Sequence, residues 1–244
     1  MDVSGSIGRR VAFFGGSFDP PHEGHLAVAR AARDALALDT VLFVPVGAQP
    51  LKPEGSNASF EDRLAMTGLA VAGEAGLSVS QLDAPRPLAA PNYTFDSLVR
   101  LRAEIPADGS LFCLLGADSF LSLRQWHRAA EIPFLAALVV ASRPGLPLDD
   151  MHAALPRGLT LSASTIRHGL ACKSIDLRSY VVNGPDRETA PLYVLPGLQV
   201  EISASEIREA VRGAIGAADL SSGAELPQLS PAVLEYIRRH RLYR

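Results

Sequence analysis

Short apolar runs alternate with amphipathic helical patterns over most of this 244-residue chain. Four runs lack the polar alternation of a strand with one solvated face, which indicates strands buried on both faces of a sheet. These runs lie at 11–14, 41–44, 111–115 and 136–140, with a further strand expected at 77–80. Helical patterns lie at 25–38, 59–72, 95–104, 203–214 and 231–240. The repeated strand–helix–strand order predicts an α/β fold, a doubly wound parallel sheet with C-terminal helices.

One stretch does not follow this alternation. Residues 144–189 are rich in proline, glycine and small residues, and their hydrophobic periodicity is weak. We interpret the region as an irregular insertion at about 146–195 within a single domain that spans 1–244. The hydrophobic content of 48% is ordinary for a globular protein, so a complete core can form around the strands.

Composition and charge argue against several classes of protein. The net charge is −3, so no overall positive field attracts nucleic acid. Cys113 and Cys172 form no C-x-x-C pair, and Cys113 lies in an apolar run, so we expect neither a disulfide nor a zinc site. Residues 1–6 lack the pattern of a signal peptide, and the longest apolar run, 135–141, is too short to span a bilayer. We expect a soluble cytoplasmic protein without membrane or nucleic-acid partners.

The segment Gly15–His25, with the sequence GGSFDPPHEGH, joins the first strand to its helix. It follows the carboxyl end of a strand, where open α/β sheets bind ligands. Its two glycines allow close approach of a ligand, and the backbone N–H groups that follow can hold phosphate. His22 and His25 stand three residues apart at a helix start, a place that favours anions. A plain turn with two incidental histidines is the alternative, but two of the six histidines fall here around Gly24. The segment is neither a Walker A loop nor G-x-G-x-x-G.

This segment resembles the N-terminal motif of the nicotinate mononucleotide adenylyltransferases, members of the H-x-G-H nucleotidyltransferase superfamily. Further blocks similar to those of the family follow in the family's order, at Asn92–Leu98, Gly116–Asp118 with Leu123 and Trp126, Ser142–Gly145, Ile202–Arg208 and Leu229–Tyr243. Only the region at about 146–195 has no counterpart. The resemblance therefore implies a Rossmann-like nucleotidyltransferase fold over nearly the whole chain.

The resemblance also implies a reaction in NAD biosynthesis. The phosphate of nicotinate mononucleotide attacks the α-phosphorus of ATP, pyrophosphate leaves, and nicotinate adenine dinucleotide (deamido-NAD) forms. The family's catalysis needs no covalent enzyme intermediate and consists of positioning and charge stabilisation. The implied cofactor is Mg²⁺, bound mainly through the ATP phosphates and water, with no metal site built by the protein itself.

The resemblance assigns roles to individual residues. His22 and His25 are the expected catalytic residues, as contacts of the ATP phosphates. The expected ATP-binding residues are Gly15, Gly16, Ser17, Phe18, His22, Gly24, His25, Asp118, Arg143, Ile202, Ser203, Ser205 and Arg208. The expected residues for nicotinate mononucleotide are Ser17, Phe18, Lys52, Tyr93, Thr94, Asp96 and Trp126, with Trp126 stacked on the pyridine ring.

Several of these residues also have a purely structural interpretation. Lys52 could be a solvated surface lysine, since its surroundings differ from the family's usual sequence, and Trp126 could be a core residue. Asp118 could simply cap a helix. Asp96 could equally cap its own helix or contact ribose.

The block from Ser203 to Arg208 combines a capping box, Ser203 with Glu206, and an arginine that could pair with phosphate. A near repeat of this block lies at 161–167. Either copy could bind phosphate. We choose the later one because it has the capping box and precedes the tail of the family at the expected distance.

Other functions remain open at this stage. Phosphopantetheine and cytidylyl transferases share the H-x-G-H turn, and nicotinamide mononucleotide is a close competitor as acceptor. A nucleotide-binding protein without catalysis is the alternative from another class, although the presence of His22, Gly24, His25 and Arg208 argues against it. A homo-oligomer is also compatible with the sequence.

Overall fold

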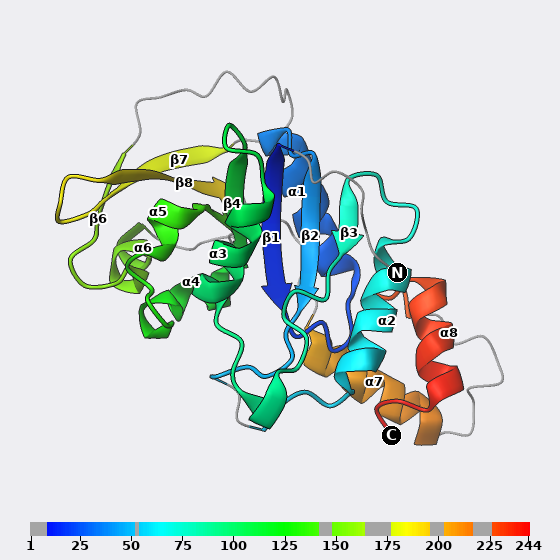
Figure 1. Cartoon of the computed structure of the whole chain (residues 1–244). Coiled ribbons are helices and arrows are strands. Elements are labelled where there is room, and N and C mark those ends of the chain that lie inside the picture. The colour runs from blue at the N-terminus through cyan, green and yellow to red at the C-terminus, as the bar shows by residue number, and fades with distance from the viewer. Residues whose placement is uncertain (1–8, 52–53, 142–147, 164–176, 196–202, 217–225) are drawn as a thin grey trace. The chain divides into compact units, whose positions relative to one another are not determined.

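The structure is a computed structural model and describes residues 9–51, 54–141, 148–163, 177–195, 203–216 and 226–244 (Figure 1). Within these residues, eight strands form one sheet in the order β3-β2-β1-β4-β5-β8-β7-β6. The strands are β1 (Arg10–Gly16), β2 (Thr40–Pro45), β3 (Leu77–Val79), β4 (Ser110–Gly116), β5 (Ala137–Ala141), β6 (Thr160–Ala163), β7 (Arg178–Asn183) and β8 (Thr189–Leu195).

Helices connect most of these strands. They are α1 (Glu23–Leu36), α2 (Phe60–Val71), α3 (Thr94–Glu104), α4 (Ala117–Leu121), α5 (Ile132–Leu135), α6 (Leu148–Ala154), α7 (Ala204–Gly216) and α8 (Pro231–His240), with 3₁₀ turns η1 (Pro87–Ala89) and η2 (Leu123–Gln125). None of the helices in the described ranges is both long enough and apolar enough to cross a membrane.

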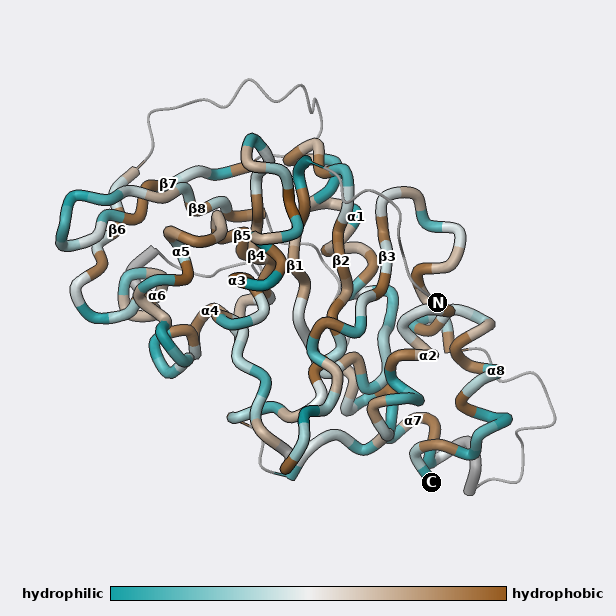
Figure 2. Tube along the Cα trace, in the orientation of Figure 1, coloured by the Kyte–Doolittle hydropathy of each residue, from teal (hydrophilic) through white to brown (hydrophobic). Residues whose placement is uncertain are grey.

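The middle of the sheet is parallel, as the alternation of strands and helices predicted. β1 pairs with β4, β4 with β5, and β5 with β8, all parallel, whereas β7 and β6 continue the sheet antiparallel. The predicted α/β Rossmann-like fold is confirmed. Brown, apolar residues follow the parallel strands (Figure 2). Among them Cys113 is fully buried in β4, and burial raises the pKa of its thiol to about 12, so it is an inert core residue.

The described chain groups into two compact units, each made of three segments. Unit 1 comprises 1–15, 29–42 and 93–199, and unit 2 comprises 16–28, 43–92 and 200–244. Unit 1 contains the parallel strands with α3 to α6. Unit 2 contains the segment after β1 together with α2, α7 and α8. The expectation of one domain over 1–244 stays a prediction.

The stretch expected to be irregular contains α6 and three strands, so that expectation is wrong for its described residues. β8 pairs parallel with β5, and its Leu192 and Leu195 are fully buried. Two features hid these strands in the sequence. Pro191 interrupts the run of β8, and β7 has only one fully buried residue, Val182, among half-exposed neighbours.

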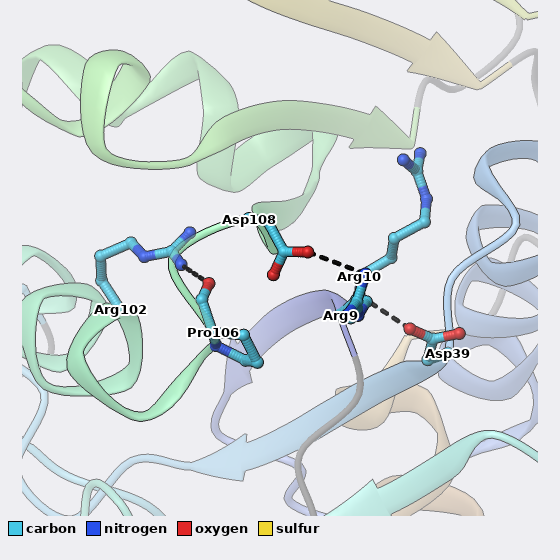
Figure 3. Close-up of polar contacts among 6 residues, drawn as sticks. All are labelled: Arg9, Arg10, Asp39, Arg102, Pro106 and Asp108. Atoms are coloured by element: carbon cyan, nitrogen blue, oxygen red, sulfur yellow. Dashed lines mark hydrogen bonds and ion pairs between the residues drawn. The ribbon is translucent and has the colours of Figure 1, made fainter.

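Polar contacts fix the amino ends of the strands in unit 1 (Figure 3). The backbone N–H of Arg10 donates to the Asp39 carboxylate at 2.8 Å, and Arg9 pairs with Asp108 at 2.7 Å. Arg102 donates to the carbonyl oxygen of Pro106 at 2.6 Å. These contacts tie the chain before β1 to the loops before β2 and β4. The carboxyl ends of the strands then lead into the candidate site.

In unit 2, one apolar cluster holds α2, α7 and α8 together. It includes the fully buried Met66 of α2, Ile207 of α7, and Val233 and Ile237 of α8. α2 and α8 lie side by side (Figure 1). The predicted cap of α2 is confirmed, because the Ser59 hydroxyl accepts from the Asp62 N–H.

Candidate active site

The turn that follows β1 is shaped by Phe18, whose backbone has φ of 47° and whose ring is buried. This ring packs edge-on against His25 at a centroid distance of 5.0 Å and against Phe43 at 5.3 Å. A Cβ atom on Gly16 would lie 3.0 Å from the Phe18 ring. On Gly15, in unit 1, it would lie 2.7 Å from the Phe13 ring. Both glycines are therefore needed for packing, in addition to the ligand access expected from the sequence.

His22 and His25 lie together, as their spacing predicted. Their ring centroids are 3.7 Å apart, with 33° between the planes. The backbone N–H of His22 donates to Nδ1 of His25 at 3.2 Å, so a neutral His25 carries its proton on Nε2. Nδ1 of His22 is buried and makes no hydrogen bond within the described residues. The pair thus combines a His25 ring oriented through its Nδ1 with a His22 ring nitrogen that is buried and unsatisfied within the described residues.

Both imidazoles are neutral at neutral pH. Burial lowers the pKa of His22 to about 4. Burial also lowers the pKa of His25 well below its usual value, and the neighbouring His22 lowers it further. Protonation of either ring in this buried place would require a negative charge close by.

The lowered pKa of His22 predicts a loss of stability in mild acid. The unfolded chain takes up a proton near pH 6.5, whereas folded His22 does so near pH 4, so stability falls as the pH falls through that window. Between pH 7.5 and 5.0 the contribution of His22 is about 2 kcal/mol. Urea unfolding at both pH values should show a smaller decline for His22→Gln than for wild type. The exposed His152 provides the control, and equal declines for wild type, H22Q and H152Q would contradict the prediction.

Asp19 anchors the same turn from within unit 2. Its side chain is 4% exposed and accepts hydrogen bonds from the backbone N–H of Asn57 at 2.6 Å and of Ala58 at 3.1 Å. The side-chain amide of Asn57 also donates to this carboxylate at 3.2 Å, and the Tyr243 hydroxyl donates to it at 2.8 Å. Its backbone oxygen accepts from Arg208 at 2.7 Å. Asp19 was part of the recognised motif, but its role as an anchor was not visible in the sequence.

The later Ser-Ala-Ser block begins α7 with the predicted capping box. Glu206 N–H donates to the Ser203 hydroxyl at 3.1 Å, and Ser203 N–H donates to the Glu206 carboxylate at 3.2 Å. Arg208 contacts the Ser205 hydroxyl at 3.0 Å as well as the Asp19 backbone. The structure thus brings Ser205 and Arg208 to the turn formed by the GGSFDPPHEGH motif (the motif turn). Phosphate binding by these residues stays a prediction.

Arg63 is a buried residue beside the turn that the sequence did not indicate. It lies on α2, its side chain is 2% exposed, and its guanidinium donates to the carbonyl oxygens of Ser17 at 2.7 Å, Val46 at 2.8 Å and Ala58 at 3.3 Å. Burial lowers the pKa of Arg63 and the Asp19 carboxylate raises it, but a guanidinium stays charged at neutral pH. Arg63 therefore links the turn after β1 to the end of β2 and the start of α2.

Other expected residues of unit 2 lie on or near the turn. The Ser17 hydroxyl donates to the Gln49 side chain at 3.0 Å, and Gly24 is buried in the first turn of α1. Lys52, Arg143 and Ile202 lie outside the described residues, as does most of the near repeat at 161–167.

Unit 1 holds four of the seven residues expected to bind the mononucleotide. Tyr93, Thr94 and Asp96 lie at the start of α3, and the Tyr93 ring stacks on His127 with centroids 4.4 Å apart. Trp126, directly before His127, is partly exposed, and its indole N–H donates to the Ser122 hydroxyl at 3.2 Å. Trp126 is therefore no fully buried core residue. The four expected residues share one neighbourhood within unit 1.

The capping interpretations of the two aspartates are wrong. The N-cap of α3 is Tyr93, and Asp96 lies in the first turn. The N-cap of α4 is Gly116, and Asp118 is exposed in the first turn beyond the carboxyl end of β4. Each carboxylate still lies near a helix N-terminus, where negative charge is favourable. Contact with ribose stays a prediction for both.

Comparisons with known proteins identify the family of the chain. The profile of the cytidylyltransferase-like family matches residues 13–210. Two similar bacterial proteins, from Laribacter hongkongensis and Chromobacterium violaceum, are each named "probable nicotinate-nucleotide adenylyltransferase". The first is 38% identical over 96% of this chain and 94% of its own length. The second is 39% identical over 96% and 99%.

A solved structure supports the fold. The Plasmodium falciparum nicotinic acid mononucleotide adenylyltransferase complexed with NaAD aligns with a TM-score of 0.64 over 97% of this chain and 98% of its own. At 14% identity this likeness carries the fold alone.

Proposed function

The chain belongs to the cytidylyltransferase-like family and, within it, to the nicotinate-nucleotide adenylyltransferases, and from that premise we propose its reaction. It transfers the adenylyl group of ATP to nicotinate mononucleotide. A phosphate oxygen of the mononucleotide forms a bond to the α-phosphorus of ATP, and the bond from that phosphorus to the bridging oxygen of the β-phosphate breaks. Pyrophosphate leaves with the bonding electrons, and nicotinate adenine dinucleotide forms.

The observation that carries the proposal is the geometry of His22 and His25. The hydrogen bond from the His22 backbone to His25 Nδ1 orients the His25 ring and places the proton of a neutral His25 on Nε2, the nitrogen that donates to the α-phosphate in this proposal. A donor that strengthens as charge develops on the α-phosphate stabilises the transition state more than the ground state. Such a donor contributes about 2.7–4 kcal/mol where an oxyanion is stabilised. Neither histidine acts as a nucleophile in this scheme.

The metal requirement is part of the same proposal. Among the residues that the structure describes, no three His, Cys, Asp or Glu side chains lie close enough to hold an ion. An Mg²⁺ ion delivered with ATP fits this chain, because phosphate oxygens and water supply most of its ligands. When bound, it neutralises charge on the phosphates. The residues of the chain then only have to position the phosphates.

The acceptor follows from the residues of unit 1. The partly exposed Trp126 offers a flat surface for a pyridine ring, and its indole N–H is fixed by Ser122. Backbone N–H groups at the start of α3, from Thr94 onward, favour a carboxylate. This combination supports nicotinate over nicotinamide as the base, and over acceptors without an aromatic ring.

The test measures pyrophosphate release and identifies the dinucleotide by mass. ATP alone should give no pyrophosphate, whereas ATP with nicotinate mononucleotide should give one pyrophosphate per dinucleotide. Nicotinamide mononucleotide and 4′-phosphopantetheine serve as competing acceptors, and a higher kcat/KM with either would reject the proposed acceptor. Binding of ATP without turnover on any acceptor would favour a nucleotide-binding protein.

Loss of the indole should affect one substrate only. Trp126→Ala is expected to raise the KM for nicotinate mononucleotide roughly 10-fold, the effect of one lost base–aromatic stack, and to leave the KM for ATP within twofold. Trp126→Phe keeps a flat ring and should recover most of the loss. Steady-state kinetics with each substrate varied in turn measures both constants. Equal increases in the two KM values would mean that Trp126 only supports the fold.

A further inference from the structure

The segment Leu226–Arg244 holds the motif turn at both of its flanks, entirely within unit 2. Before α8, the backbone oxygen of Gln228 accepts from the Glu23 N–H at 2.8 Å, at the start of α1. After α8, the Tyr243 hydroxyl donates to Asp19 Oδ1 at 2.8 Å. His22 lies between these two points in the sequence. Two contacts from one segment therefore hold the chain on both sides of His22.

The end of α8 directs Tyr243 to this contact. Arg241 adopts the left-handed conformation with φ of 56°, and its N–H bonds to the carbonyl oxygen of Arg238. The Leu242 N–H bonds to the carbonyl oxygen of Ile237 at 3.1 Å. These two bonds form a Schellman motif, which reverses the chain at the helix end. Tyr243 is thereby placed in the apolar cluster, 8% exposed.

The hydroxyl of Tyr243 acts as a hydrogen-bond donor to Asp19. Burial raises the pKa of Tyr243, and the Asp19 carboxylate raises it further, so the hydroxyl stays protonated. The other three donors to the Asp19 side chain all come from Asn57 and Ala58. Tyr243 is therefore the one described side chain that holds this carboxylate from the direction of α8. Without it, Oδ1 keeps only the Ala58 N–H.

We propose that Tyr243 is a positioning residue of the adenylyl-transfer site, which holds Asp19 and thereby the turn that presents His22 and His25 to the ATP phosphates. The inference rests on the proposed function. Tyr243 itself contacts neither substrate in this scheme. Its effect on the reaction is transmitted along the backbone from Asp19 through Pro20 and Pro21 to His22. A small displacement of these imidazoles lowers the rate, because catalysis by positioning depends on geometry.

The experiment compares Tyr243→Phe with Tyr236→Phe in the full chain. Tyr236 lies on α8, and its hydroxyl donates to the Asp62 carboxylate at 3.0 Å, so both variants lose one tyrosine–aspartate hydrogen bond. Only Tyr243 holds the motif turn. Y243F should lower kcat roughly 10-fold, or about 1.4 kcal/mol in activation free energy, with the KM for nicotinate mononucleotide unchanged. Y236F should stay within twofold of wild type.

A second readout follows the imidazoles themselves. The C2–H proton resonances of His22 and His25, assigned with H22Q and H25Q, should shift in Y243F and stay in place in Y236F. Unfolding curves give the fraction of folded protein for each variant. Wild-type kcat in Y243F, or equal losses in both variants, would overturn the proposal. If the wild type itself transfers no adenylyl group, the proposed function fails, and unmoved histidine resonances in Y243F then overturn the positioning role separately.

Discussion

Replacing His25 with alanine is expected to lower turnover by about 10²–10³-fold and to leave the fold intact. The magnitude is that of one preorganised donor to a developing oxyanion. The loss should fall mainly on kcat, because a donor to the α-phosphate strengthens its hydrogen bond only as charge develops there. Rapid-quench measurement of dinucleotide formation at saturating substrates separates this chemical step from product release.

The exposed His152 on α6 provides the matched control, since H152A removes the same ring from unit 1. H152A should retain wild-type turnover. His25→Gln is informative as well, because a side-chain amide still offers an N–H donor and should recover part of the rate. Turnover of H25A within threefold of wild type would remove His25 from the mechanism and leave the turn as a binding element only.

Arg63→Met is expected to cause a large loss of stability in unit 2. Methionine has a similar length but no donor, so the carbonyl oxygens of Ser17, Val46 and Ala58 lose their partner in a buried place. Unsatisfied buried acceptors cost about 1–3 kcal/mol each, and partial relaxation reduces the sum to about 3–5 kcal/mol. Such a loss lowers the melting temperature by roughly 10 °C in a chain of this size.

Arg102 is a natural comparison for this substitution. It also donates to three carbonyl oxygens, those of Ile105, Pro106 and Gly109, but it is only partly buried, and its bond to Pro106 is exposed. Arg102→Met should therefore cost about 1 kcal/mol or less, because water can replace the lost donors. Urea unfolding of both variants measures the difference. Equal losses of unfolding free energy in the two variants would show that burial of the Arg63 guanidinium does not increase the cost of its removal.

The sequence predicted most of the regular elements because their hydrophobic patterns are local. The helix expected at 231–240 begins and ends at those residues, and the buried strands at β1, β2, β4 and β5 lie within two residues of their predicted bounds. β6, β7 and β8 were missed for a physical reason. Two of them are antiparallel neighbours at one side of the sheet with partly exposed residues, and Pro191 interrupts the third. Their pairing depends on β5, which is distant in sequence.

The residues of the site also fall into those that local sequence predicts and those that depend on distant segments. The pairing of His22 with His25 follows from spacing at a helix start and could be predicted. The roles of Asp19, Arg63 and Tyr243 could not, because each depends on partners from other segments. Arg63 is a charged residue among the buried positions Phe60, Met66 and Thr67 of α2. A charge on the apolar face of a helix is the one local signal that could have indicated it.

Two hydrogen bonds of Asp19 join residues that are very far apart along the chain. Arg208 lies 189 positions and Tyr243 lies 224 positions beyond it. A ribosome delivers the H-x-G-H turn early, at about 5–20 residues per second, so the turn waits roughly ten seconds or more for both partners. During synthesis Asp19 therefore gains its bond to Tyr243 only after 224 further residues have been made.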